Sequence, residues 1–295
     1  MAESTSQIYT PLNLQELFAQ WGRQPDSRLY SCGTKIVKFQ RGRRFVLPQK
    51  IISLEKIEEL KRISRTERYL ELGSMVKLNK ILSLGRIVPE LLRKFLELCE
   101  TEAVRNLETL CGAIFAGASG HDLTGSTLST PPESGFRAVR GAMCALGASY
   151  ELRTASTSRW ISASRYSNDL KNEFQNPDEI LVRVRIPLEK WDWILCRKFR
   201  AFDRQGREEG YAAFLARVQN DTLSEVRIVF SGEDLLRDSY CEHMITGKKL
   251  PLSKEETKQF LERWKTFFNG VPGSPQFLTS RCLRFLYEAA VNFTE

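Results

Sequence analysis

A run of small residues, 110–122, is the sequence feature that most constrains the fold. It reads Leu-Cys-Gly-Ala-Ile-Phe-Ala-Gly-Ala-Ser-Gly-His-Asp, and its three glycines permit tight turns or the close approach of a ligand. A shorter stretch upstream, 29–37, has the same character, because apolar residues flank a Cys32-Gly33-Thr34 corner. Successive N–H groups at such a corner form a concave nest that suits a phosphate. A plain hairpin or β-bulge is the alternative interpretation of each corner.

The length and composition indicate a folded chain of more than one unit. A chain of 295 residues is long enough for two or three hydrophobic cores, and its hydrophobic content of 42% is ordinary for a folded protein. No apolar run approaches the ~20 residues that span a membrane. The first residues carry no basic segment followed by an apolar one, so we expect no export signal.

The seven cysteines are scattered and include no C-x-x-C pair. This pattern argues against a disulfide framework, and against a zinc or iron–sulfur site carried by this chain alone. We therefore expect a cytoplasmic protein that binds no metal by itself.

The formal net charge of +8 raises nucleic acid as a partner. The basic residues are spread over two stretches, 35–44 and 183–207, and no known DNA- or RNA-binding pattern accompanies them. A solvated basic face that attracts an anionic cofactor or an acidic partner subunit is the interpretation we favour. We expect neither nucleic acid nor a membrane as a partner.

Hydrophobic periodicity and turn residues predict two lobes in residues 1–174. The elements predicted for the first lobe, about 1–60, are helix 10–22, strands 28–31, 35–40 and 50–54, and a short helical segment capped by Ser53. The elements predicted for the second lobe, 61–174, are strand 69–73, helices 77–83 and 88–98, strand 150–154 and an apolar pair at 160–161.

A polar, turn-rich stretch at 169–178 is the predicted domain boundary. Beyond it, 179–295 is predicted to form a β-sheet backed by helices. The predicted strands are 179–186 and 191–200, followed by a hairpin of 212–218 and 223–230 joined through Asn220-Asp221. The predicted helices are 235–245, 254–268 and 276–293.

Several motifs follow one another along the chain at spacings typical of one family. Residues 31–36 stand in the place of the pattern A-G-G-T-D-L, and 105–114 match R-N-x-x-T-x-G-G-N-I, the most specific piece. Residues 118–123 fall on S-P-x-S-D-L without a gap, and 197–200 match a strand that bears a lysine. Over essentially its whole length, the chain resembles the flavoprotein (medium) subunit of the molybdenum hydroxylases, the family of xanthine dehydrogenase and aerobic carbon monoxide dehydrogenase.

The resemblance implies an α+β chain of two domains. A two-lobed FAD-binding domain of the molybdopterin-dehydrogenase (PCMH-like) type occupies 1–174, and a three-stranded sheet with a helical bundle occupies 179–295. The dinucleotide lies between the two lobes. The two glycine corners wrap its pyrophosphate through backbone N–H groups.

The resemblance also assigns individual residues to the cofactor. Thr34 and Thr109 add hydroxyl donors, Asp122 accepts from the ribityl hydroxyls, and Lys198 lies near the isoalloxazine ring. The implied cofactor-binding residues are Ser31, Cys32, Gly33, Thr34, Lys35, Ile36, Thr109, Cys111, Gly112, Ala113, Ile114, Asp122 and Lys198. No residue of this chain is implied in catalysis on the organic substrate or in binding a metal.

The implied role is electron transfer. In the family, FAD takes electrons from [2Fe–2S] clusters in a small subunit, which drain a molybdenum cofactor in a large subunit, and passes them to NAD or another acceptor. The expected partners are those two subunits. We expect an oxidoreductase subunit that does not act on the organic substrate alone.

The chain departs from the family pattern at the two corners. Cys32 and Cys111 replace the first glycine of each, Ala113 replaces the asparagine, and Lys35 replaces the acid. Cysteine enters a left-handed conformation only at a cost of roughly 1 kcal/mol or more. If those glycines are needed only for their small size, FAD still fits, with Lys35 as a phosphate partner. The alternative is a flavin-poor or flavin-free structural docking subunit.

The same two corners raise a hypothesis about their cysteines. If both corners face one phosphate, Cys32 and Cys111 lie close together. A disulfide between them is then one hypothesis, and small, inert side chains are the other.

Overall fold

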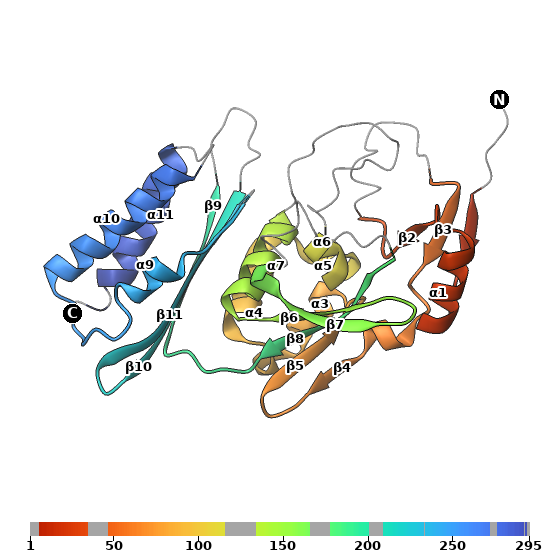
Figure 1. The fold of residues 1–295 in the computed structure, drawn as a ribbon, viewed down its shortest axis with the longest axis horizontal. Helices are drawn as coiled ribbons and strands as arrows, with labels where there is room; N and C mark the ends of the chain where they lie inside the picture. Colours follow the sequence, from red (N-terminus) through yellow and green to blue (C-terminus); the bar gives the residue numbers. More distant parts are fainter. Residues whose placement is uncertain are drawn as a thin grey trace. The chain divides into compact units, whose positions relative to one another are not determined.

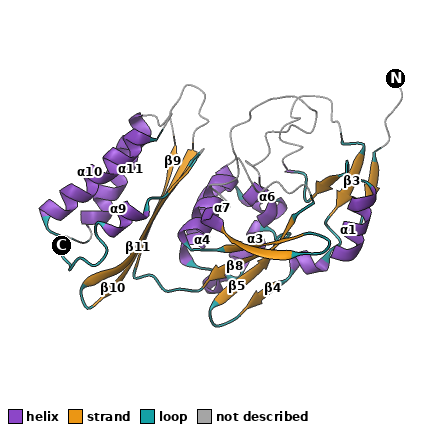
Figure 2. Cartoon of the chain, in the orientation of Figure 1, coloured by secondary structure: helices purple, strands orange, loops and turns teal. Residues whose placement is uncertain are grey.

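The computed structural model describes residues 6–34, 47–115, 134–165, 178–200, 209–232, 234–271, 276–291 and 293. The chain divides into two compact units, Met1–Leu188 and Glu189–Glu295 (Figure 1). Both units combine helices with β-sheet, which confirms the α+β class (Figure 2). No helix within the described ranges is long and apolar enough to cross a membrane.

A three-stranded parallel sheet opens the first unit. Its strands run in the order β1 (Gln7–Tyr9), β3 (Lys50–Ser53) and β2 (Arg28–Tyr30). Helix α1 (Leu14–Arg23) begins at Asn13, whose side chain accepts a hydrogen bond from the Glu16 N–H (2.9 Å). Leu14 and Leu17 of this helix share a buried cluster with Ile52. The sheet and its helix form the predicted first lobe.

Two details of this lobe differ from the prediction or fall outside it. The short 3₁₀ helix η1 (Glu58–Lys61) begins without a side-chain cap, so Ser53 does not start it. The predicted strand 35–40 lies outside the described residues.

The second lobe is built on a five-stranded antiparallel sheet. Its strands run in the order β4 (Ile63–Arg65), β5 (Tyr69–Gly73), β8 (Ile180–Pro187), β6 (Ser149–Arg153) and β7 (Ser158–Ser162). The helical segments of this lobe are α3 (Leu78–Ser83), η2 (Gly85–Ile87), α4 (Glu90–Cys99), α5 (Glu102–Leu107), α6 (Leu110–Phe115) and α7 (Ser134–Ala145). Helix α7 packs against both α4 and α6, and the helices group beside the sheet (Figure 2).

Strand β8 corrects the predicted domain boundary. The sequence pattern predicts this strand at the start of the C-terminal domain, after 169–178. In the structure it is the central strand of the second lobe, where Val184 pairs with Leu72 of β5 and Tyr150 of β6. Its apolar side chains complete the core of the first unit, so the boundary lies after Leu188.

The other side chains of β8 form ion pairs across the sheet. Arg183 contacts Glu71 (2.9 Å) and Glu151 (2.9 Å), and Arg185 contacts Glu71 (2.8 Å). The guanidinium group of Arg185 also lies over the ring of Trp160, at 4.1 Å from its centroid. These two arginines therefore belong to a paired network and not to the solvated basic face that the sequence suggested.

Within its described residues, the second unit is a four-stranded antiparallel sheet with three helices, and its short strand β12 is the one that the implied three-stranded sheet lacks. Its strands run in the order β12 (Leu235–Leu236), β11 (Thr222–Ser231), β10 (Glu209–Gln219) and β9 (Trp193–Arg200). Asn220 and Asp221, with φ of 50° and 56°, form the turn between β10 and β11. Two successive positive φ values are what a tight hairpin requires, so the predicted hairpin is confirmed.

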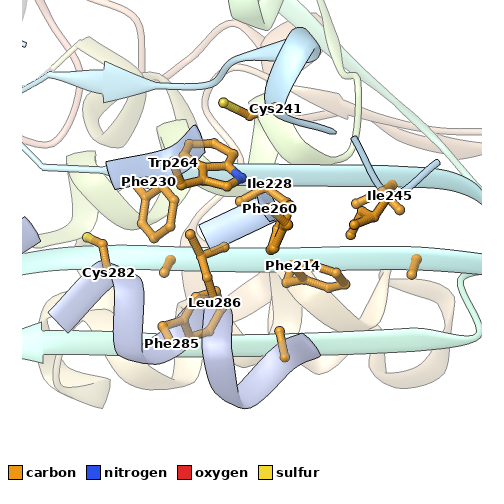
Figure 3. Close-up of a cluster of buried hydrophobic side chains, with 14 of the residues drawn as sticks. Phe214, Ile228, Phe230, Cys241, Ile245, Phe260, Trp264, Cys282, Phe285 and Leu286 are labelled. Atoms are coloured by element: carbon orange, nitrogen blue, oxygen red, sulfur yellow. The ribbon is translucent and has the colours of Figure 1, made fainter. Parts of the chain in front are cut away.

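The helices of this unit cover one buried aromatic cluster. They are α9 (Ser239–His243), α10 (Lys254–Gly270) and α11 (Gln276–Val291). Phe230 of β11 meets the rings of Trp264, Phe268 and Phe285 edge-on, at centroid distances of 5.5, 5.2 and 6.0 Å (Figure 3). The predicted helix 235–245 is shorter in the structure, because Leu236 pairs with Phe230 as strand β12.

Candidate functional site

The first corner follows strand β2 directly. The Tyr30 carbonyl at the end of the strand accepts a hydrogen bond from the Leu54 N–H (2.9 Å), after which the chain turns away from the sheet. Gly33 has a left-handed φ of +68°, and a Cβ placed on it would fall 1.9 Å from Tyr30 Oη. Only glycine meets both conditions without a local rearrangement.

The corner presents three consecutive backbone N–H groups, those of Cys32, Gly33 and Thr34. Within the described parts of the chain, the N–H groups of Cys32, Gly33 and Thr34 donate no hydrogen bond. Three consecutive free donors around one left-handed residue have the arrangement of an anion nest. This corner can therefore hold a phosphate group by its main chain.

The second corner, at Cys111 and Gly112, is the start of helix α6 and not a turn between strands. Thr109 caps the helix, since its Oγ1 accepts a hydrogen bond from the Gly112 N–H (3.1 Å). The N–H groups of Leu110 and Cys111 donate to the carbonyls of Val76 and Ser74, both at 2.8 Å. These donors already have acceptors, so the second corner does not offer the free amides that were predicted for it.

The two corners nevertheless meet. Ser31 Oγ lies 2.7 Å from Thr109 Oγ1, although 78 residues separate them, and Ser31 Oγ donates to Met75 Sδ (3.2 Å). The donors form one directed chain, from the Gly112 N–H to Thr109, from Thr109 to Ser31, and from Ser31 to Met75. Such a chain fixes the position of the nest relative to helix α6.

The two cysteines at the corners sit in unstrained backbone. Neither Cys32 nor Cys111 is among the described residues with positive φ, so the predicted cost of a left-handed cysteine does not arise. Both are half-buried free thiols. Burial and, to a lesser extent, the neighbouring Cys32 raise the pKa of Cys111 to about 12. Cys111 is therefore a neutral thiol near pH 7.

The remaining predicted site residues fall into three groups. Ala113 and Ile114 are buried in the core by helix α6, at 0% and 2% exposure, which gives them a packing role. Lys198 lies on β9 of the second unit, where its ammonium group is 5.6 Å from the centroid of the Tyr211 ring. The predicted residues Lys35, Ile36 and Asp122 lie outside the described residues.

Sequence reasoning missed Tyr30 and Met75. The Tyr30 side chain lies against Gly33, and the position of this aromatic residue three residues before the glycine could have indicated the contact. Met75 contacts Ser31 only through the tertiary fold, and no sequence spacing indicates that contact. Within the described ranges, no three His, Cys, Asp or Glu side chains gather as metal ligands.

Comparison with known proteins agrees with this architecture. The sequence pattern of the family described as "FAD binding domain in molybdopterin dehydrogenase" matches residues 4–189. The chain therefore belongs to this family, as the resemblance of its motifs implied. The end of the match coincides with the end of the first unit, at Leu188. No curated protein matches the chain in sequence.

Solved structures share the fold over the whole chain. The carbon monoxide dehydrogenase of Hydrogenophaga pseudoflava, in a form that lacks the Mo-pyranopterin moiety, has a chain that is 20% identical, with a TM-score of 0.75 and coverage of 100% of this chain and 98% of that one. Quinoline 2-oxidoreductase of Pseudomonas putida 86 matches at 20% identity, a TM-score of 0.72 and the same coverage. Reconstituted CO dehydrogenase of Oligotropha carboxidovorans matches at 17% identity, a TM-score of 0.75 and coverage of 100% and 99%.

Proposed function

We propose that this chain is the FAD-binding subunit of a molybdenum-hydroxylase complex and carries electrons between the other subunits and an acceptor. The observation that carries the proposal is the free nest at Cys32, Gly33 and Thr34, held beside Thr109 by Ser31, in a chain of the FAD-binding family. When bound, FAD supplies the electron-carrier chemistry that no side chain provides.

The residues of the first corner fit one phosphate of the cofactor. Their three N–H groups have no acceptor among the described residues, and Gly33 brings no side chain of its own to the nest. Thr109 has a different role, since its hydroxyl is used between Gly112 and Ser31. We infer that Thr109 positions the nest and does not itself hold the cofactor. Lys35, Asp122 and Lys198 remain proposed contacts of the phosphate, ribityl and flavin groups.

The proposed electron path runs from [2Fe–2S] clusters of a small partner subunit, through FAD, to NAD or another acceptor. A large partner subunit would carry the molybdenum cofactor and the organic substrate, so this chain alone would not oxidise that substrate. The structural relatives include a Cu,Mo-CO dehydrogenase and a quinoline oxidoreductase, which supports this class of complex. We place the complex in the cytoplasm.

The experiment is a flavin-binding measurement on the purified full chain. We expect a yellow protein that bleaches with dithionite, and stoichiometric uptake of added FAD if the chain is isolated without it. Riboflavin, which has no phosphate, serves as the control ligand and should bind at least 100-fold more weakly. A colourless chain that takes up no FAD would contradict the proposal.

A second candidate function is a flavin-free docking subunit of the same kind of complex. The observation that favours it is the second corner, where Val76 and Ser74 already satisfy the N–H groups of Leu110 and Cys111. This candidate predicts a colourless chain that still forms a complex with the molybdenum and iron–sulfur subunits. Co-purification of the three subunits without flavin would support it over electron transfer.

A further inference from the structure

Two cysteines at the proposed flavin site have no role in the proposed function. Cys32 directly follows Ser31, and Cys111 lies two residues after Thr109. Because Ser31 Oγ and Thr109 Oγ1 are 2.7 Å apart, the backbones that carry both cysteines are held side by side. Both cysteines are free, and each residue is partly exposed.

The two thiols differ in reactivity. Burial raises the pKa of Cys111 to about 12, and the effect of Cys32 on that pKa places the two sulfur groups within electrostatic reach of each other. Cys32 Sγ lies 3.5 Å from Thr34 Oγ1, a hydroxyl that can donate a hydrogen bond to a thiolate. The thiolate is the reactive form of cysteine, and the raised pKa of Cys111 disfavours it, so we assign the first attack to Cys32.

We propose that Cys32 and Cys111 are a redox-active thiol pair that closes to a disulfide by exchange with a low-molecular-weight disulfide, and that closure weakens flavin binding. The second half of this proposal rests on the proposed function; the first half does not.

The exchange proceeds in two steps. The Cys32 thiolate attacks one sulfur of the small disulfide, which forms a mixed disulfide and releases one thiol. Cys111 then loses its proton to solvent and attacks Cys32 Sγ, which closes the protein disulfide and releases the second thiol. Two cysteine thiols are oxidised, and one small disulfide is reduced to two thiols.

Closure acts on the nest through Cys32. A disulfide holds its two sulfur atoms about 2 Å apart, so its closure ties the Cys32 corner covalently to helix α6. The N–H of Cys32 is one of the three free donors of the nest, and Gly33 and Thr34 follow it directly. A nest tied to the helix in this way can no longer converge on a phosphate, so the oxidised chain should bind FAD more weakly.

The test compares the full chain after dithiothreitol with the full chain after oxidised glutathione. Non-reducing peptide mass spectrometry reports the disulfide, and titration of flavin fluorescence reports the dissociation constant of FAD. We expect a Cys32–Cys111 disulfide after oxidation, at least a tenfold increase in the dissociation constant, and reversal by dithiothreitol. Cys32→Ser, which keeps the backbone N–H but removes the thiol of the first step, should show the same FAD affinity in both treatments. Cys196→Ser, which removes a half-buried thiol from the second unit, should keep the tenfold response.

The outcomes separate the two halves of the proposal. Two free thiols after oxidation, or glutathione retained on Cys32 without a protein disulfide, would overturn the thiol pair. A disulfide that forms without changing the FAD affinity would overturn its effect on the flavin. A chain that forms the disulfide and binds no FAD in either state would uphold the thiol pair and overturn the flavin-binding function.

Discussion

The ring of Tyr30 lies against Gly33, so close that a Cβ on the glycine would fall 1.9 Å from the tyrosine Oη. Gly33 also has a left-handed φ of +68°. Two independent conditions therefore require glycine at this position, and Gly33 supplies the middle N–H of the nest. The aromatic side chain at the end of β2 and the phosphate-binding geometry of the next turn are linked through this one residue.

Gly33→Ala tests this link. We expect the free energy of unfolding to fall by about 1–2 kcal/mol from the left-handed backbone alone, and more if Tyr30 cannot move aside. The FAD dissociation constant should rise at least tenfold, because the nest must shift. Chemical denaturation and FAD titration measure the two effects. Gly85→Ala is the matched control, since Gly85 has a φ of +61° with no atom within 4 Å of an added Cβ, and it should keep the FAD affinity.

Ser31→Ala tests the chain of donors from Gly112 to Met75. The substitution removes the acceptor for Thr109 and the donor to Met75, and we expect a loss of about 1 kcal/mol in unfolding free energy. The FAD affinity should fall as well, since the nest loses its tie to helix α6. Ser83→Ala is the control, because the exposed Ser83 hydroxyl donates only to the Lys80 carbonyl (2.7 Å). Equal FAD affinities in the two variants would argue against a positioning role for Ser31.

The small-residue run shows what the sequence could and could not predict about the site. Glycine suggested a turn, but Thr109 caps a helix, and Leu110, Ala113 and Ile114 recur at the spacing of a buried helical face. This helical spacing was present in the sequence, but the glycines were interpreted as turn residues instead. The carbonyls of Ser74 and Val76, which satisfy the N–H groups of this helix, come from a distant segment, and local sequence contains no trace of them.

Strand β8 shows what the sequence could and could not predict about the fold. The alternation of apolar residues with Arg183 and Arg185 predicted the strand and its two faces correctly. Alternation does not identify the neighbouring strands, so the sequence placed β8 in the wrong unit. The acidic partners Glu71 and Glu151 lie on β5 and β6, and only the sheet order reveals that they face these arginines.

Glu71→Gln tests the ion-pair network of that sheet. Burial opposes the ionisation of Glu71, but hydrogen bonds from Arg185 and Arg183 outweigh it and hold the pKa of Glu71 below its usual value. A lowered folded-state pKa means that this stabilisation is fully present above the usual pKa and is lost as the pH falls through the lowered value. We expect the variant to lose about 1 kcal/mol of unfolding free energy at pH 7, since the arginines are partly exposed.

Urea denaturation from pH 7 to pH 3 measures this effect. The difference between the original chain and the Glu71→Gln variant should be constant near neutral pH and shrink below about pH 4.5, where Glu71 becomes protonated in the unfolded chain first. Glu58→Gln is the control, because the exposed Glu58 pairs only with Lys61 of its own helical turn, and it should change stability by less than about 0.5 kcal/mol. A difference that persists unchanged at pH 3 would show that charge is not its cause.

Phe285→Ala tests the aromatic cluster of the second unit. Phe285 is fully buried, and its ring meets those of Phe199 and Phe230 edge-on at 6.2 and 6.0 Å. Removing the ring leaves a cavity between α11 and the sheet, so we expect the unfolding free energy of this unit to fall by about 3–5 kcal/mol. Tyr287→Ala, two residues along the same helix, removes a ring that is 54% exposed and should cost less than about 1 kcal/mol. Chemical denaturation followed by tryptophan fluorescence compares the two, because Trp264 lies in the same cluster. Similar losses in both variants would show that the buried ring contributes no more to stability than the exposed one.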